Sequence, residues 1–144
     1  MYERILVPLD GSDRAELALP FAEELAAKLG SEVILLCVSD SAEAEDYAKH
    51  QIYVDQITPY VRRAASKRRT DPEKPVKITP AITVGSAANE IIDYAMKKNV
   101  NLIIMATHGR SGVTHWRLGS VAEKVVRAGK SPVMLVRVPG ASDV

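Results

Sequence analysis

The chain has 144 residues, 47% of them hydrophobic, which is enough to fill the core of a single domain spanning residues 1–144. The net charge of +1 gives no electrostatic reason to expect nucleic-acid binding. No apolar run approaches the length of a membrane span, and no secretory signal opens the chain, so we expect neither a membrane helix nor a leader. The single cysteine, Cys37, lies within an apolar run, which predicts a buried, reduced thiol in a cytoplasmic protein.

Five apolar runs predict the strands of a sheet. Their residues are apolar at nearly every position rather than at alternate ones, which is typical of strands buried on both faces, as in parallel sheets. In chain order the runs are Arg4–Leu9, Glu32–Val38, Val76–Val84, Val100–Thr107 and Pro132–Val138.

Two helical regions precede the third of these runs. Asp13–Leu29 carries one apolar face and ends before Gly30, a residue that favours helix C-caps. Pro20 lies inside this helix, and we expect a bend there rather than a break. The next region is less regular: 41–50 is polar, whereas an apolar stripe runs through 57–65.

The remaining helices complete an alternating pattern. Ala87–Lys98 follows the third run, and Val121–Ala128 precedes the fifth. Strands that alternate with helices in this way predict an α/β fold with one parallel, doubly wound sheet and helices on both faces. The basic segment Arg62–Arg69 is interpreted as a solvated helix face, because it lacks the interleaved aromatic residues of a nucleic-acid site.

A glycine-rich, basic loop, ATHGRSGVTHWRLGSVAEK, separates the fourth predicted strand from the last helix. Gly109 and Gly112 allow positive φ, so the loop can turn its backbone amides inward, and Gly119 lets a ligand come close to the backbone. Arg110 and Arg117 would add positive charge. The alternative interpretation is a flexible loop that leads into a helix.

The sequence SVAE predicts a capping box at the start of that helix, with Ser120 as N-cap and Glu123 at the third helical position. Free amides and the positive end of the helix dipole stabilise an anion at such a start. Asp10, just past the first strand, is suited to accept hydrogen bonds from ribose hydroxyls, although a turn or cap residue is the alternative. Together the two loops indicate a nucleotide site at the carboxyl edge of the sheet.

Other motifs do not fit their usual contexts. The tripeptide GKS at 129–131 lacks the upstream glycine and the strand–loop–helix order of a P-loop. His50, His108 and His115 show no metal-ligand spacing, and Ser12 lies in no recognisable nucleophile motif. No pair of residues stands out as a general acid and base.

Nearly the whole chain resembles the universal stress protein family. The segments that carry the resemblance are ILVPLDGS, EVILLCV and, most specifically, THGRSG with LGSVAEKVV and SPVMLV. ATP-binding members carry a glycine, two residues, a second glycine, nine residues, a third glycine and then Ser or Thr. Gly109, Gly119 and Ser120 match this motif, whereas Ala106 stands in place of its first glycine. Trp116 stands where an aliphatic residue is usual, and we interpret it as a core or interface packing residue, with ligand contact as the alternative.

The resemblance implies a five-stranded sheet of order 3-2-1-4-5 that binds ATP, with or without Mg²⁺, between the first and fourth strands. Asp10 would hold the ribose and the Val38 backbone the adenine. Ala106 implies weaker binding if that position needs positive φ, and little effect if it needs only a small side chain. The residues assigned to the site in this way are Pro8, Asp10, Val38, Ala106, Gly109, Arg110, Gly119, Ser120 and Val121.

The function implied is a cytoplasmic stress-response protein that uses ATP as a ligand or switch. Two alternatives stay open: a nucleotide-free protein-interaction module and a slow ATP hydrolase. The last predicted strand, Pro132–Val138, would be a sheet edge, and its apolar residues predict a homodimer formed through this edge.

Overall fold

The computed structural model describes residues 1–109 and 117–139. Its centre is a five-stranded sheet of order β3-β2-β1-β4-β5 in which every pairing is parallel. The predicted fold class and strand order are therefore confirmed. The strands are β1 (Arg4–Leu9), β2 (Glu32–Ser39), β3 (Lys77–Val84), β4 (Leu102–Ala106) and β5 (Val133–Val136).

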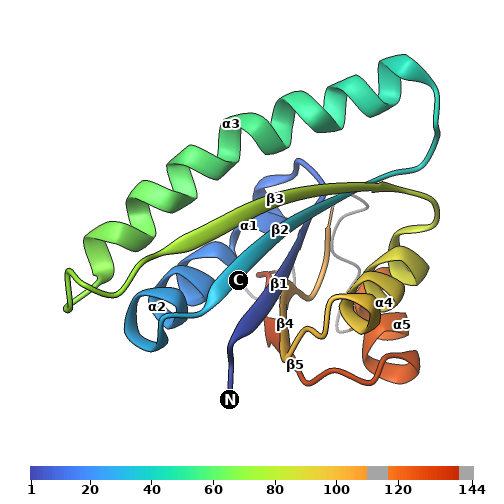
Figure 1. Ribbon diagram of the computed structural model, residues 1–144. Coiled ribbons are helices and arrows are strands. Elements are labelled where there is room, and N and C mark those ends of the chain that lie inside the picture. Colours follow the sequence, from blue (N-terminus) through green and yellow to red (C-terminus); the bar gives the residue numbers. More distant parts are fainter. Residues whose placement is uncertain (110–116, 140–144) are drawn as a thin grey trace.

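Helices cover both faces of the sheet (Figure 1). On one face, α2 and α3 pack over the side chains of Ile5, Val7 and Leu35. On the other, α4 and α5 pack over Leu6 and Leu36. Because β1, β2 and β4 carry apolar residues on both faces, they are almost completely buried, whereas the edge strands β3 and β5 are partly exposed. The helices are α1 (Asp13–Glu16), α2 (Leu19–Leu29), α3 (Ala44–Arg68), α4 (Ala87–Lys97) and α5 (Ser120–Ala128).

The first predicted helix is interrupted, so the expectation of a bend without a break was wrong. α1 ends at Glu16, and α2 begins at Leu19 with Pro20 in its first turn. Proline is tolerated there because the first amides of a helix have no intrahelical partner. The C-cap prediction was correct: Gly30 has φ of 71° and donates its N–H to the Ala26 carbonyl at 3.0 Å.

The irregular second region is one 25-residue helix, α3, which includes much of the polar segment expected at 41–50. Pro59 lies inside it, and the neighbouring Thr58 hydroxyl donates to the Val54 carbonyl at 2.7 Å. The helix continues through Pro59 because Val54, Val61 and Ala65, on either side of it, are buried against the sheet.

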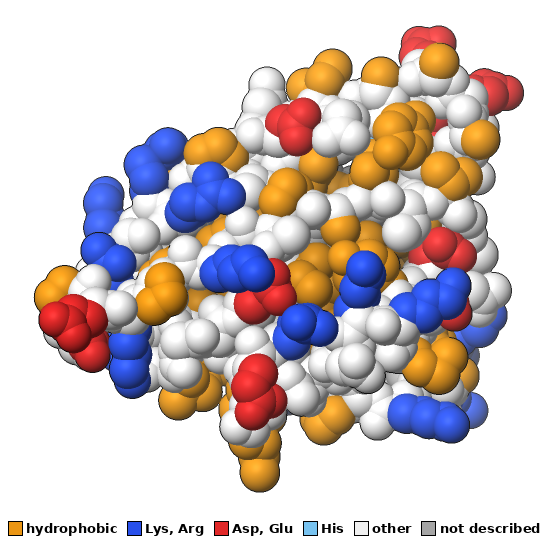
Figure 2. Space-filling model, viewed as in Figure 1, with side chains coloured by type: hydrophobic (Ala, Val, Ile, Leu, Met, Phe, Trp, Pro, Cys, Tyr) orange, Lys and Arg blue, Asp and Glu red, His pale blue; other side chains and the backbone are white. Residues whose placement is uncertain are grey.

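The basic segment at the end of α3 is only partly a solvated face. Lys and Arg side chains gather over this end of α3 at the left of Figure 2. Arg62, however, donates to the Ile78 carbonyl at 2.9 Å, and Arg68 pairs with Glu23 at 3.4 Å and Glu24 at 3.0 Å. These two arginines therefore tie α3 to β3 and α2. Within the described ranges, no helix is both long and apolar enough to cross a membrane.

Candidate functional site

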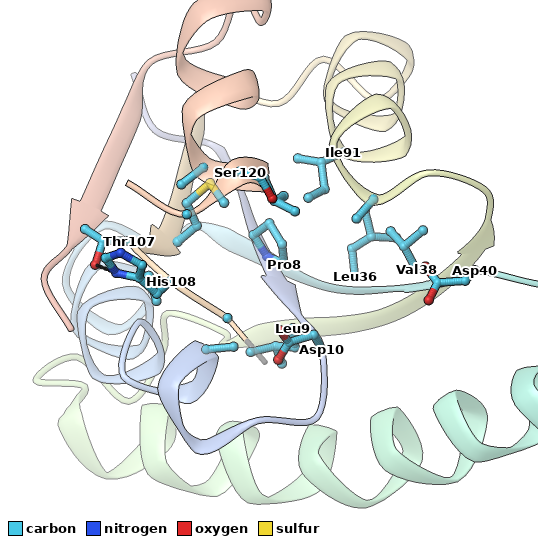
Figure 3. Close-up of a pocket in the computed structure, with 18 residues that line it drawn as sticks. Pro8, Leu9, Asp10, Leu36, Val38, Asp40, Ile91, Thr107, His108 and Ser120 are labelled. Carbon is cyan, nitrogen blue, oxygen red and sulfur yellow. Dashed lines mark hydrogen bonds between the residues drawn. The ribbon is translucent and has the colours of Figure 1, made fainter. Parts of the chain in front are cut away.

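A cavity of about 270 Å³ opens at the carboxyl edge of the sheet, where β1 and β4 diverge (Figure 3). In a doubly wound sheet this is the place where the direction of winding reverses. Two helix starts face the strand ends across the cavity: α4 through Ala87 and Ile91, and α5 through 120–122. Its strand-end walls are formed by residues 8–10 at the end of β1 and just beyond it. Leu36, Val38 and Asp40 contribute from β2 and just after it, and residues 105–109 from the end of β4 and the loop that follows.

Eight of the nine residues assigned to the site line this one cavity. They are Pro8, Asp10, Val38, Ala106, Gly109, Gly119, Ser120 and Val121. The ninth, Arg110, lies outside the described residues, as do Gly112 and Trp116. Arg117 does not line the cavity; it borders a separate surface depression beside Glu123 and Arg127.

The Asp10 carboxylate holds the turn after β1. Its Oδ1 accepts hydrogen bonds from the Ser12 amide at 2.9 Å and the Ser12 hydroxyl at 2.6 Å. Ser12 in turn caps α1, because its Oγ accepts from the Ala15 amide at 3.2 Å. Asp10 is thus a turn residue, and its carboxylate also lies on the cavity wall (Figure 3). The two interpretations of this residue are compatible.

Gly109 is a glycine because of contact, not because of backbone conformation. Among the described glycines only three others have positive φ, so Gly109 does not use the left-handed conformation that glycine allows. A Cβ atom at this position would lie 2.3 Å from Asp10 Oδ2, closer than atoms can approach. The Gly109 carbonyl also accepts from Arg14 Nε at 2.6 Å. The β1 and β4 loops therefore meet here, in contact with each other.

Gly119 is also used by the fold itself. Its amide donates to the Thr107 carbonyl at 2.8 Å, and a Cβ atom on it would lie 2.9 Å from that oxygen. Glycine at this position is therefore required by the fold, whether or not a ligand approaches the backbone here. The loop returns to the end of β4 at Gly119, and α5 begins at the next residue.

The predicted capping box does not form. Gly119, not Ser120, is the N-cap of α5, and the structure shows no side-chain hydrogen bond to that cap. Glu123 pairs instead with Arg127 at 3.1 Å. Ser120 is the first helical residue, and its side chain lies at the cavity (Figure 3). The first amides of α5, which have no intrahelical acceptor, therefore border the cavity together with the positive end of the helix dipole.

Thr107 and His108 close the base of the loop, and the sequence analysis missed both. His108 is buried, and its Nε2–H donates to the Arg117 carbonyl at 2.5 Å. In the neutral ring, Nδ1 then accepts from the Thr107 hydroxyl at 2.9 Å. Thr107 Oγ1 itself accepts from the Val138 amide at 3.0 Å. No local sequence pattern indicates that Thr107 and His108 form these hydrogen bonds.

Ala106 is buried at the end of β4 and does not have positive φ. The position therefore needs a small side chain rather than a left-handed backbone, and alanine fits it without strain. The interpretation in which Ala106 weakens ATP binding required positive φ at this position, and that requirement is not met. In the described part of the chain, no cluster of three His, Cys, Asp or Glu side chains could hold a metal ion.

Comparison with known proteins agrees with this architecture. Universal stress protein MJ0531 of Methanocaldococcus jannaschii is 32% identical over 143 residues, which cover 96% of this chain and 84% of that protein. YxiE, a universal stress protein of Bacillus subtilis, is 31% identical over 148 residues, covering 95% of this chain and all of that one (100%). The solved structure of protein MJ0577 is 31% identical with a TM-score of 0.68, covering 98% of this chain and 99% of that one.

More distant structures share the fold. A universal stress protein solved in complex with cAMP has a TM-score of 0.71 at 21% identity, covering 94% of this chain and 97% of that one. One from Archaeoglobus fulgidus, in complex with dAMP, has a TM-score of 0.71 at 23% identity, covering 93% and 97%. The model of the universal stress protein family matches residues 1–137, which include every described strand and helix. On this match and on relatives above 30% identity that span almost its full length, the chain belongs to the universal stress protein family.

Proposed function

We propose that this protein binds ATP in the cavity at the carboxyl edge of the sheet and uses it as a ligand or switch in a cytoplasmic stress response. The observation that carries the proposal is the combination of chemical groups that line the cavity (Figure 3). At one end of the cavity lies the Asp40 carboxylate, next to the apolar side chains of Leu36 and Val38. Farther along, the Asp10 carboxylate and the start of α5 at Ser120 lie on opposite sides of Pro8.

These groups match the parts of an adenine nucleotide. Apolar walls suit a flat, weakly hydrated ring, and a carboxylate suits the hydroxyls of a sugar. A helix N-terminus suits phosphate, because free amides and the helix dipole both favour an anion. Two neighbours in fold were solved with cAMP and dAMP, which supports a nucleotide of this class without assigning it to this chain.

The first experiment measures nucleotide released from freshly purified protein by denaturation, followed by calorimetric titration of the emptied protein with ATP. We expect ATP to be released or to bind on titration. The nucleotide-free interaction module left open above predicts neither result. Absence of both would overturn the proposal.

The phosphate contact has a selective test at Ser120. Gly119 has φ of −59° and ψ of 152°, the extended conformation that a residue before proline prefers. Ser120→Pro should therefore keep α5 intact, because proline suits the first helical position, while deleting one cavity-facing amide donor. We expect it to weaken ATP by about 1.5–3 kcal/mol, the range for a hydrogen bond to a charged group, and to leave adenosine affinity almost unchanged.

Ser120→Ala is the matched control, because it removes the hydroxyl and keeps the amide. It should weaken ATP clearly less than Ser120→Pro does. If the proline variant is folded and binds ATP as tightly as the alanine variant, the phosphates do not bind at this helix start.

The ribose contact is tested by comparing ATP with 2′,3′-dideoxy-ATP. Wild-type protein should prefer ATP, and Asp10→Ala should lose most of that preference, since the carboxylate that accepts from the hydroxyls is gone. A variant that still discriminates as strongly as wild type would show that Asp10 is not the ribose partner.

We also propose a homodimer in which the β5 edges of two copies pair. β5 is the last strand of the sheet, and its Leu135 side chain is 36% exposed, although its neighbours Met134 and Val136 pack into the core. An edge strand with an exposed apolar side chain is a template for pairing, and two copies related by a two-fold axis would satisfy each other's backbone groups.

A further inference from the structure

The outward side of α3 carries a short apolar stripe. Ile52 and Tyr60 are each 58% exposed, and the exposed Gln56 lies midway between them in sequence. Four-residue spacing places all three side chains along one side of the helix, opposite Val54 and Val61, which are buried against the sheet. Exposed apolar side chains that stand alone are common on protein surfaces, so this stripe indicates a partner only if its surroundings do.

The two ends of α3 carry charges of opposite sign. Its start has Glu43 and Glu45, and its last two turns have Arg63 and Lys67. All four side chains are exposed, and none forms an ion pair within the described residues. In Figure 2 the acidic end of α3 lies at the upper right and the basic end at the left, with hydrophobic side chains between them. The helix therefore presents an acidic end, an apolar middle and a basic end to solvent.

We propose that this side of α3 is an interface between two copies of the chain, in which the two helices lie antiparallel about a two-fold axis at Gln56. Ile52 and Tyr60 are each four residues from Gln56, so Ile52 of one copy faces Tyr60 of the other. Glu45 and Lys67 are each eleven residues from it, so they pair between the copies. The two-fold axis makes each of these contacts occur twice.

A second copy fits this surface better than an unrelated partner of one charge does. An inverted copy places base against acid at both ends of the helix. An acidic or a basic partner would match only one end and would be repelled at the other. The same charges disfavour a parallel arrangement, in which each end would meet its own like charge.

The contact should be weak, because it is confined to one helix. A helix of 25 residues is about 37 Å long and about 10 Å wide, so its pairing buries on the order of 700 Å² over both copies. That is less than the roughly 1,200 Å² of the smallest stable interfaces, so we expect association at about 0.1–1 mM and not at micromolar concentration. The contact is separate from the nucleotide cavity and from β5, which forms the opposite edge of the sheet.

The test is sedimentation equilibrium at these concentrations and low ionic strength, with Leu135→Lys in every protein so that the β5 edges do not contribute. This background protein should form dimers. Glu45→Lys and Lys67→Glu, added singly, each put like charges into both pairs between copies and should weaken self-association about 10-fold. An equimolar mixture of the two variants should associate as strongly as the background protein, because every pair between unlike copies is attractive again.

Lys49 and Arg63 provide an independent prediction. Each lies seven residues from Gln56, so these like charges meet in the proposed dimer. Lys49→Glu should therefore strengthen self-association about 10-fold, since it turns two repulsions into two attractions. Lys124→Glu is the matched control: Lys124 is exposed on α5, over the other face of the sheet, and the same change of charge there should alter association less than about 2-fold.

Three results would overturn the proposal. The first is a background protein that remains monomeric at about 1 mM. The second is a mixture of the Glu45→Lys and Lys67→Glu variants that associates no more strongly than either variant alone. The third is an equal gain from Lys49→Glu and Lys124→Glu, which would show that net charge governs association. ATP affinity should be the same in all of these variants, so none of the three results bears on the proposed nucleotide site.

Discussion

Alanine at position 109 provides the most direct test of the contact between the β1 and β4 loops. The added Cβ would lie 2.3 Å from Asp10 Oδ2, more than about 1 Å inside a comfortable contact of roughly 3.5 Å. The carboxylate cannot rotate away freely, since its Oδ1 accepts two hydrogen bonds from Ser12. Gly109→Ala should therefore destabilise the protein by about 1–3 kcal/mol, through either overpacking or the loss of those bonds.

Removing the Asp10 carboxylate should reverse the sign of this effect. Gly109 does not have positive φ, so alanine is compatible with its backbone and lowers the entropy of the unfolded chain. In an Asp10→Ala background, we expect Gly109→Ala to be neutral or to stabilise by about 0.5–1 kcal/mol.

The assay is a double-mutant cycle from urea unfolding of the four proteins. The two effects of Gly109→Ala should differ by more than about 1 kcal/mol between the backgrounds. If the substitution costs the same whether residue 10 is Asp or Ala, the close contact does not govern this position and the reasoning fails.

Four further predictions concern separate parts of the molecule. Burial, with a smaller effect from Asp10, raises the pKa of the Cys37 thiol to about 12, so iodoacetamide at pH 8 should label it only after unfolding, and rapid labelling of folded protein would contradict this. Ser120→Ala should change the free energy of unfolding by less than about 0.5 kcal/mol, because this hydroxyl does not cap α5. A loss of stability near 1 kcal/mol would instead show that Ser120 caps the helix. Ala106→Gly should not tighten ATP binding in calorimetry, since alanine is unstrained there, and a clear gain would show otherwise. Leu135→Lys should give monomers in sedimentation at micromolar concentration, while a lysine at the exposed Leu29 of α2 leaves the dimer intact; an unchanged dimer in the first variant would exclude the β5 edge.

The sheet was predictable because its signal is repeated. Continuous apolar runs such as those of β1 and β2 tolerate almost no other placement than the centre of a parallel sheet. The family resemblance then supplied the strand order, which hydrophobic patterns alone do not determine. The residues brought to the cavity follow from the same rule, since the carboxyl ends of parallel strands meet at one edge.

The errors arose where a short local motif met a tertiary contact. SVAE has every residue of a capping box, yet the bond from the Gly119 amide to the Thr107 carbonyl places the helix start one residue earlier. Gly109 was interpreted as a residue that allows positive φ. The structure shows instead that a side chain at this position would collide with Asp10, which lies 99 positions away in sequence. No local pattern contains that information.

Asp40 was accessible to sequence reasoning and was overlooked. It follows β2 directly, so the rule that ligands bind beyond the carboxyl ends of strands would have included it. Thr107 and His108 were less accessible, because their role depends on hydrogen bonds to Arg117 and Val138 that only the folded chain reveals.

The hydrogen bonds of Thr107 and His108 join two regions that are usually considered apart. From the Val138 amide, two residues beyond β5, an unbroken series passes through the Thr107 hydroxyl and the His108 ring to the Arg117 carbonyl at the returning end of the loop. The outer strand and the mouth of the cavity therefore share one mechanical linkage. Coupling through these bonds would be reciprocal. If a partner that displaces β5 changed ligand affinity by some factor, the ligand would change affinity for that partner by the same factor.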